Sequence, residues 1–220
     1  MSVKVRVWGP MACFTRAEMK TERVSYDIMT PSAARGILEA IYWHPGLLWV
    51  VDTITVCRTI RFTNIRRNEV KSTILASKVR RVMEQGSGGE ELYIATPQDI
   101  QQRAAMVLRD VEYVIEAHFV LTDKANPSDN AGKFQDIMKR RLEKGQCFHT
   151  PYLGCREFPA HFAPCTEVPL CPTELLGEKD LGYMLWDMDY SDPENIRPLF
   201  FRAKLVNGVL QVPGREEVIG

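Results

Sequence analysis

The sequence predicts a mixed α+β fold of the ferredoxin-like or RRM-like type, in which strands and helices follow the order β-α-β-β-α-β. Three observations support this prediction: segments of alternating apolar and polar residues, two segments with helical periodicity, and short apolar segments near the end of the chain. A basic segment is inserted between the second and third strands, and a small β tail follows the last. The 220 residues suffice for one well-buried domain with an appendage, or for two small domains.

The first half of the chain supplies a strand, a helix and a second strand. Residues 3–8 alternate apolar with basic residues, which is the pattern of a half-buried strand. Thr30 and Pro31 predict the start of a helix, because a hydroxyl caps the first amides and proline favours the first helical position. Apolar residues then recur at helical spacing as far as Ile41. Residues 47–56 form a dense apolar run that predicts the second strand.

The second half supplies another strand, helix and strand, and then the tail. Residues 111–121 alternate strongly and predict the clearest strand of this half. A helix is expected over residues 132–144 with Gly145 as its C-terminal stop, and a further strand within residues 148–162. The tail contains short apolar segments, and Asn207-Gly208 predicts a tight hairpin turn within the last of them.

Charge is balanced over the whole chain but not along it. The 28 basic and 28 acidic residues give a net charge that predicts no polyanionic partner. Residues 1–81, however, hold 14 Lys and Arg against 6 Asp and Glu, whereas residues 157–220 hold 5 against 11. Such asymmetry favours a nucleic-acid partner, and two ordinary solvated faces are the alternative.

The basic charge is densest in the segment inserted between the second and third strands. Residues 58–81 contain eight basic residues, and Glu69 is the one acid among them. This composition indicates an extended basic hairpin or thumb. The glycine-rich residues 85–90 predict a mobile loop at its end.

No segment of the sequence indicates export, membrane insertion or a metal centre. The first residues lack an apolar signal core, and no run reaches the about 18 apolar residues of a membrane helix. A cytoplasmic protein with reduced cysteines is therefore expected. Four of the six cysteines lie within residues 147–171 with two histidines among them, but no two of these cysteines have the close spacing typical of zinc ligands. We therefore expect neither a metal nor another cofactor.

Four stretches of the sequence are similar to a known family. They are ERVSYDIMTPSAARGILEAIYWHP (residues 22–45), VVDTITVCRTIRFTNIRRNEVKS (50–72), LRDVEYVIEAHF (108–119) and LGCREFPAHF (153–162). The chain resembles the CRISPR-associated Cas-five family in its subtype I-C (Dvulg) branch. The resemblance implies an RRM-like domain over residues 1–165, with the basic thumb at about 58–85, and a small antiparallel β-sheet domain over residues 166–220.

The resemblance also implies a function. Proteins of this kind are expected to cut the repeat hairpin of precursor CRISPR RNA without a metal and to stay bound to its 5′ handle. They would do so as a subunit of the Cascade antiviral complex, beside backbone subunits of the Cas-seven family and a large subunit of the Cas-eight family. Target DNA would be reached only indirectly, and no membrane is implied.

The family's active site is a tyrosine at the end of the first helix together with a lysine and a histidine on a later strand. By this resemblance Tyr42 and His118 are the candidate catalytic residues. Ala117 precedes His118, so the lysine has no counterpart there. His44, or a lysine of the basic thumb such as Lys71, would have to replace it.

These residue types suit metal-free cleavage, in which the RNA 2′-hydroxyl attacks the adjacent phosphate. A histidine, with an ordinary pKa of about 6.5, accepts or donates a proton near neutral pH. A tyrosine is a poor base there because its ordinary pKa is about 10, so Tyr42 is expected to orient the 2′-hydroxyl or donate to a phosphate oxygen. The expected products carry 2′,3′-cyclic phosphate and 5′-hydroxyl ends.

Each candidate also has a purely structural interpretation. Tyr42 lies one turn after Leu38 and could cover the core, while His118 could pair with a glutamate on its own strand face. With the resemblance, we expect Tyr42 to face the RNA and the neighbouring Trp43 to lie in the core.

Basic residues are the candidate RNA contacts, because Lys and Arg beside phosphates release counterions and give salt-sensitive binding. These candidates are Arg16, Lys20, Arg23, Arg61, Arg66, Arg67, Lys71, Arg80 and Arg81. The alternative function is a non-catalytic RNA-binding scaffold subunit of the same complex, which the missing lysine favours. A metal-dependent nuclease is a third option, for which no pair of carboxylates stands out.

Overall fold

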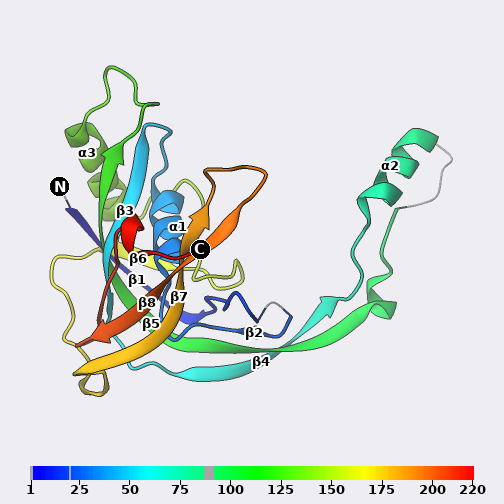
Figure 1. Ribbon diagram of the computed structural model, residues 1–220, viewed down its shortest axis with the longest axis horizontal. Coiled ribbons are helices and arrows are strands. Elements are labelled where there is room, and N and C mark those ends of the chain that lie inside the picture. Colours follow the sequence, from blue (N-terminus) through cyan, green and yellow to red (C-terminus); the bar gives the residue numbers. More distant parts are fainter. Residues whose placement is uncertain (1, 20, 87–91) are drawn as a thin grey trace. The chain divides into compact units, whose positions relative to one another are not determined.

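The computed structural model describes residues 2–19, 21–86 and 92–220, and the chain forms two compact units (Figure 1). One unit comprises residues 1–63 and 106–220, and the other comprises residues 64–105. No helix within the described ranges is both long enough and apolar enough to cross a membrane. The helices and strands are, in chain order, β1 (Ser2–Ala12), β2 (Arg23–Val24), α1 (Pro31–Ile41), β3 (Leu47–Val56), β4 (Phe62–Val70), α2 (Ala76–Gln85), β5 (Ile100–Leu121), α3 (Ala131–Lys144), β6 (His161–Pro164), β7 (Glu178–Asp189), β8 (Arg197–Val206) and β9 (Val209–Gln211), with short 3₁₀ helices at Thr96–Gln98, Thr173–Leu175 and Arg215–Glu217.

The first unit is built on one sheet. Its strands lie in the order β6-β1-β5-β3-β9-β8-β7. The pairs β1–β5, β1–β6, β3–β5, β3–β9, β7–β8 and β8–β9 are antiparallel. Along the chain, α1 lies between β1 and β3, and α3 lies between β5 and β6. The predicted α+β class is therefore confirmed.

The C-terminal strands continue the same sheet. β9 pairs with β3, which places Thr55 opposite Val209 and Thr53 opposite Gln211. The turn between β8 and β9 has φ values of 48° at Asn207 and 75° at Gly208, and a two-residue hairpin turn requires such positive values. The predicted hairpin is thus confirmed. A domain boundary at residue 165 stays a prediction, and the pairing of β9 with β3 joins residues from both sides of it in one sheet.

α1 forms where the sequence predicts it. The Thr30 hydroxyl accepts a hydrogen bond from the Ala33 amide at 3.3 Å, and Pro31 is the first helical residue. The apolar stripe is buried and packs towards β3, with every member at most 1% exposed: Ala34, Ile37, Leu38 and Ile41. Burial of this stripe is what stabilises so short a helix, since isolated helices of its length are marginal in water.

The two aromatic side chains that follow α1 have the reverse of the expected orientation. Tyr42 is 5% exposed, whereas Trp43 is 54% exposed, so the expectation that Trp43 lies in the core is wrong. Tyr42 comes four residues after Leu38 and therefore continues the buried stripe. Its backbone is already extended, with φ of −145° and ψ of 110°, so the next side chain points to the opposite side.

An aromatic cluster fills the space between the sheet and α3. The ring centre of Phe134 on α3 lies 6.0 Å from that of Phe119 on β5 and 6.1 Å from that of Tyr42. Phe119 in turn lies 5.6 Å from Trp49 on β3. α3 ends at Gly145, whose φ of 62° is the left-handed conformation common after helix ends, so the predicted helix and its stop are confirmed.

A strand was expected within residues 148–162, but only the last two residues of this segment belong to a strand. β6 begins at His161, and the residues before it form turns and irregular backbone. Pro151 and Pro159 cannot donate to a strand ladder, and Gly154 has a φ of 82°. These three residues interrupt the extended backbone, so the strand prediction is wrong for residues 148–160.

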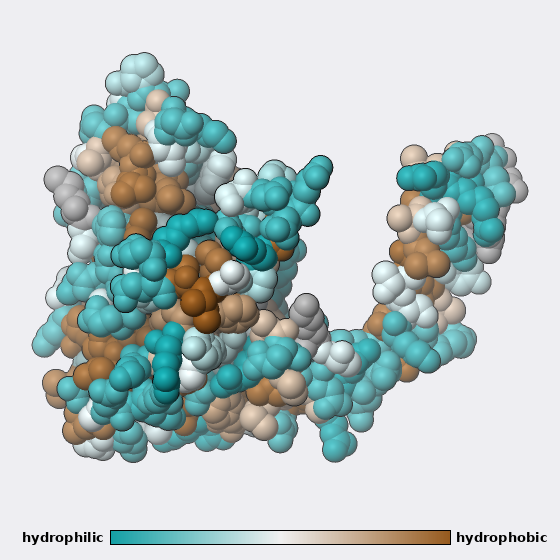
Figure 2. Space-filling view, in the orientation of Figure 1, coloured by the Kyte–Doolittle hydropathy of each residue, from teal (hydrophilic) through white to brown (hydrophobic). Residues whose placement is uncertain are grey.

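The second unit contains most of β4, all of α2 and the first residues of β5. β4 pairs with β5, and Arg103 lies 3.5 Å from Glu69 across this pair. The expected extended hairpin is wrong for residues 76–85, which form α2. The sequence pattern did not predict α2. None of its ten residues is buried, and Figure 2 shows apolar atoms exposed beside it. Of the expected mobile loop, residues 87–90 lie outside the described residues.

Candidate functional site

His118 lies on the face of the sheet that points away from α3. Its neighbour Phe119 packs against α3, and successive side chains of a strand point to opposite faces. On β1, Ser2 lies opposite His118 and Lys4 lies opposite Glu116. Directly opposed residues of an antiparallel pair share a face, so these four polar side chains lie together. We call this surface the polar face.

Asp52 of β3 completes the cluster as the partner of His118. Its Oδ1 lies 2.8 Å from His118 Nδ1, and the two side chains are 36% and 39% exposed. An ionised carboxylate can only accept a hydrogen bond, so Nδ1 carries the hydrogen and Nε2 is left for a substrate. His118 is therefore paired, but with Asp52 and not with a glutamate of its own strand.

A β-bulge places Asp52 on the polar face. Val51 and Thr53 lie opposite consecutive residues of β5, so Asp52 between them is the extra residue. Our sequence reasoning missed Asp52. The bulge is visible as a change of phase in burial, from buried odd positions up to Val51 to buried even positions from Ile54. The sequence carries no such signal, because residues 47–51 are all apolar.

Lys4 supplies a positive charge to the same cluster. Its Nζ lies 3.2 Å from Glu116 Oε2, and the side chain is 43% exposed. The Ser2 hydroxyl donates to Glu116 Oε1 at 3.0 Å. Lys4 is the diagonal neighbour of His118 in the β1–β5 pair, a separation of about 7–8 Å that long side chains bridge. Its ammonium group can thus reach an anion bound beside His118.

Glu112 occupies a buried part of the polar face between two arginines. It is 5% exposed, and it accepts hydrogen bonds from Arg6 Nε at 2.7 Å and from Arg58 Nε at 2.9 Å. Burial alone would raise the pKa of this carboxyl, but the two arginine hydrogen bonds outweigh burial and leave the pKa below its ordinary value. Glu112 is therefore an ionised counter-ion and not a proton donor at neutral pH.

Tyr42 lies on the α3 side of the sheet. Its ring packs against Phe134, and the Arg141 guanidinium lies 5.1 Å from the ring centre. Burial raises the pKa of the Tyr42 hydroxyl, and the charge of Arg141 opposes that change. Because His118 points to the other face, the structure does not bring the two candidate catalytic side chains together.

Of the two residues considered as replacements for the family lysine, one lies on the other side of the sheet and one belongs to the second unit. His44 lies on the Tyr42 side, where its Nδ1 accepts the Gly46 amide at 3.0 Å. Nε2 therefore carries the hydrogen of the neutral ring and lies 3.9 Å from Asp129 Oδ2. Lys71 belongs to the second unit.

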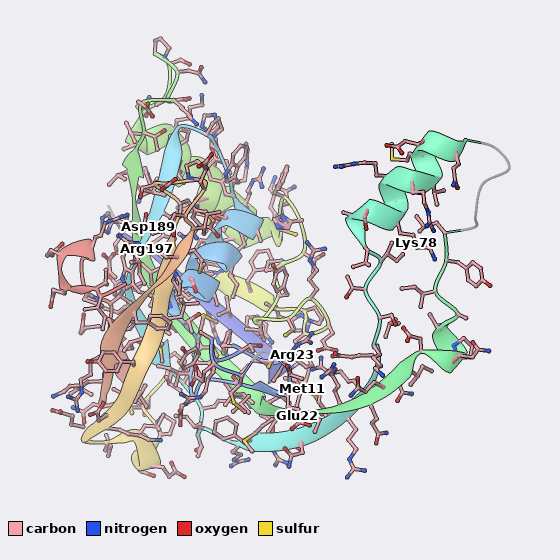
Figure 3. The ribbon with its side chains drawn as sticks, turned by 45° about the vertical axis from the view of Figure 1, so that its right-hand side comes forward. Met11, Glu22, Arg23, Lys78, Asp189 and Arg197 are labelled. Atoms are coloured by element: carbon pink, nitrogen blue, oxygen red, sulfur yellow. The ribbon has the colours of Figure 1, made fainter. Side chains whose placement is uncertain are left out.

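Three candidate RNA contacts lie in the first unit, in different environments. Arg16 pairs with Asp27 at 2.9 Å, lies over the ring of Tyr26, and is 25% exposed. Arg23 lies on β2 and is half-buried (Figure 3). Arg61 is exposed and lines a cavity of about 340 Å³. Of the three, Arg61 is the one most available to a phosphate.

The remaining candidates belong to the second unit, apart from Lys20, which lies outside the described residues. Lys78 on α2 adds a further basic side chain there (Figure 3). Four of the candidates in this unit are exposed: Arg66, Lys71, Arg80 and Arg81. The fifth, Arg67, is half-exposed. The second unit therefore presents basic groups from β4, from α2 and from the segment that joins them.

The six cysteines are thiols. All of them lie within the described residues, and none forms a disulfide. Within the same ranges no three His, Cys, Asp or Glu side chains lie close enough to hold a metal ion. Burial raises the pKa of Cys57 to about 12, so this thiol stays protonated and unreactive at neutral pH.

Comparison with known proteins identifies the family. The family model Cas_Cas5d, described as CRISPR-associated protein (Cas_Cas5), matches residues 2–213. The chain belongs to the Cas5d family. It is 51% identical over 215 residues to the CRISPR pre-crRNA endoribonuclease Cas5d of Mannheimia succiniciproducens, which covers 96% of this chain and 94% of that protein. It is 40% identical over 232 residues to the protein of the same name from Thermus thermophilus, and this alignment covers 97% of this chain and 92% of that protein.

Solved structures share the Cas5d fold seen here. One crystal structure of a CRISPR-associated protein superimposes with a TM-score of 0.70 at 24% identity, covering 100% of this chain and 97% of the other. Protein SMU1763c from Streptococcus mutans, described as functionally uncharacterized, superimposes with a TM-score of 0.68 at 20% identity, covering 100% of this chain and 97% of the other. These structures show the fold, whereas the family model and the two sequence relatives confirm the resemblance to the Cas-five family found in the sequence.

Proposed function

We propose that this chain is an endoribonuclease that cuts precursor CRISPR RNA. The observation that carries the proposal is its 51% identity, over 96% of its length, to a protein named as a pre-crRNA endoribonuclease. The polar face offers suitable chemistry, because a half-exposed histidine with a carboxylate partner lies on one face with a lysine. Such a group of side chains can transfer a proton and stabilise negative charge.

The proposed reaction is a transesterification within the RNA. The 2′-oxygen of one nucleotide forms a bond to the adjacent phosphorus, and the bond from that phosphorus to the 5′-oxygen of the next nucleotide breaks. The proton of the 2′-hydroxyl passes to a base, and the departing 5′-oxygen receives a proton from an acid. The products carry a 2′,3′-cyclic phosphate and a 5′-hydroxyl, and no metal ion takes part.

His118 is the proposed proton-transfer residue, because Asp52 occupies Nδ1 and leaves Nε2 for the RNA. Lys4 takes the part of the family's lysine, since its ammonium group reaches the same region and can neutralise charge on the reacting phosphate. A catalytic role for Tyr42 stays a prediction, and its burial on the other side of the sheet weighs against contact with the same phosphate.

The fold suits RNA binding. The strand order β6-β1-β5-β3, with α1 and α3 as the connecting helices, supports the ferredoxin-like assignment. RRM domains present their sheet to RNA, and the polar face is the corresponding surface here. The exposed basic side chains of the second unit would add phosphate contacts.

After cleavage the protein is proposed to remain on the 5′ handle as a subunit of a Cascade complex, beside Cas-seven and Cas-eight family subunits. Membership of the Cas5d family supports this part of the proposal. The alternative is a non-catalytic scaffold subunit, and it differs in one observable respect: it would bind the repeat RNA and leave it intact.

Cleavage of the cognate repeat RNA in EDTA separates these functions. Wild type, His118→Ala and Tyr42→Phe are compared for single-turnover rate, product ends and RNA affinity. We expect wild type to cut, and His118→Ala to bind normally but cut at least about 100-fold more slowly. Wild type that binds the RNA without cutting it would establish the scaffold. Loss of cleavage in Tyr42→Phe, with His118→Ala active, would move the site to the α3 side.

A further inference from the structure

We propose that Asp52 is a positioning residue for RNA cleavage, which acts through His118 and does not itself touch the RNA. The inference rests on the proposed function, because it assigns a role within that reaction. Its first support is geometric: Asp52 Oδ1 lies 2.8 Å from His118 Nδ1. Two side chains that are each more than one-third exposed are thus held in one defined arrangement at the surface.

The backbone fixes Asp52 independently of this hydrogen bond. Asp52 is the extra residue of the bulge in β3, and its carbonyl oxygen accepts the amide of Val212 at 3.0 Å. The residue directly across from His118 on β3 is Val50, which offers no polar group. A bulge redirects side chains, and this one brings a carboxylate to a histidine that the regular register would leave beside valine.

The pairing determines which nitrogen of the ring meets the RNA. With the hydrogen held on Nδ1, the neutral ring presents a lone pair on Nε2, which can take the proton of the 2′-hydroxyl. The ring then carries a positive charge, and the carboxylate stabilises it. The proton taken from the 2′-hydroxyl stays on Nε2 after the transfer and does not pass to Asp52.

The other charged groups that share this face with His118 are already engaged. Lys4 from β1 and Glu116 from β5 bind each other at 3.2 Å, and Glu116 also accepts from Ser2 at 3.0 Å. Glu116 is therefore occupied by two partners, whereas the His118 ring is in contact with Asp52. Asp52 is accordingly the carboxylate that sets the orientation of the ring.

Asp52→Asn tests the inference. An asparagine side chain can accept from Nδ1–H or donate to an unprotonated Nδ1, so it no longer holds the ring in one tautomer. ¹⁵N NMR of the RNA-free protein should show His118 as the Nδ1–H tautomer in wild type and as a mixture in the variant. Single-turnover cleavage at saturating RNA should fall at least about tenfold, with RNA affinity and melting temperature unchanged. Asp180→Asn, which removes an exposed carboxylate paired with Arg202, is the control and should cleave like wild type.

A second variant separates positioning from mere structural support. Asp52→Glu keeps a carboxylate beside the ring and should recover part of the rate lost in Asp52→Asn, even if either variant is less stable. Equal losses in both variants, or an Asp52→Asn protein with the wild-type tautomer and rate, would overturn the inference and leave the proposed function standing. Wild type that binds the RNA and leaves it intact would overturn both.

Discussion

Arg35 of α1 and Asp187 of β7 form a two-point ion pair. Arg35 Nε lies 2.7 Å from Asp187 Oδ2, and Nη2 lies 2.9 Å from Oδ1. The third guanidinium nitrogen, Nη1, binds Glu39 at 2.6 Å. The Arg35 and Asp187 side chains are only 24% and 19% exposed. One partly buried arginine therefore ties the first helix to the C-terminal strands.

Arg35→Lys should destabilise the protein by about 1–3 kcal/mol, because lysine cannot reproduce the parallel hydrogen bonds to the Asp187 carboxylate. Urea denaturation measures the change. Arg202→Lys is the matched control, since Arg202 binds only one carboxylate oxygen of Asp180 and is 65% exposed. It should cause little loss of stability, because exposed ion pairs contribute little. Equal losses for the two variants would show that burial of the Arg35 pair contributes nothing.

The burial of Tyr42 and the exposure of Trp43 predict unequal effects of truncation on stability. Tyr42→Ala should lower the free energy of unfolding by about 3–5 kcal/mol, since it removes a buried ring that packs against Phe134. Trp43→Ala should change it by less than about 1 kcal/mol, because the side chain is 54% exposed. Chemical denaturation of the two variants provides the comparison, and a larger loss for Trp43→Ala would contradict the structure.

Glu112→Gln should destabilise the protein at neutral pH but not in acid. The pKa of Glu112 in the folded protein is below the ordinary value of about 4.3, so the ionised carboxylate stabilises the fold above that value. This contribution is lost as the pH falls through the folded-state pKa. Thermal melts from about pH 3 to pH 7 should show the deficit of Glu112→Gln shrinking below about pH 4. Glu178→Gln, in an exposed pair with Lys204, should show little deficit at any pH.

Substitutions at two glycines with positive φ allow the cost of backbone strain to be compared with the cost of steric overlap. Gly145 has a φ of 62° with no atom within 4 Å of the place that a Cβ would occupy, whereas a Cβ on Gly154 would overlap the Cys13 carbonyl oxygen. Gly145→Ala should therefore cost about 1–2 kcal/mol from conformation alone. Gly154→Ala should cost at least about 3 kcal/mol, because backbone must move. Similar melting temperatures for the two variants would exclude the close approach at Gly154.

Removing a basic side chain from the second unit should weaken RNA binding in a salt-dependent way. Replacing Arg66, Lys71 or Arg80 with glutamine should lower the slope of log affinity against log salt by about 0.7–1 for each phosphate that the protein no longer neutralises. Affinity for the repeat RNA at several salt concentrations gives this slope. Arg202→Gln, an exposed arginine outside the proposed surface, should leave it unchanged. A slope equal to that of wild type would remove the substituted residue from the RNA-binding surface.

Features that depend on neighbouring residues alone were predicted correctly from the sequence. Thr30-Pro31 marked the start of α1 because a cap and a fixed φ are local properties. Asn207-Gly208 marked the hairpin because the turn demands positive φ at both residues. Gly145 ended α3 for a similar reason.

Features that depend on distant residues were not predicted from the sequence. The exposure of Trp43 follows from the residue at which α1 ends, and the helical pattern does not specify that end. Asp52 reaches His118 only through the register of β3 against β5. α2 has apolar residues at helical spacing, namely Val79, Val82 and Met83, but it buries none of them. The basic composition of this segment favoured an extended hairpin instead.

The same register has a consequence for synthesis. β9 lies in the interior of the sheet, between β3 and β8, although its three residues follow every other strand in the chain. One edge of β3 therefore has no partner until residue 209 has left the ribosome, and an unpaired edge is a template for strands of other chains. We expect the edge of β3 at Thr53–Thr55 to stay open to strands of neighbouring chains on a polysome until β9 pairs with it.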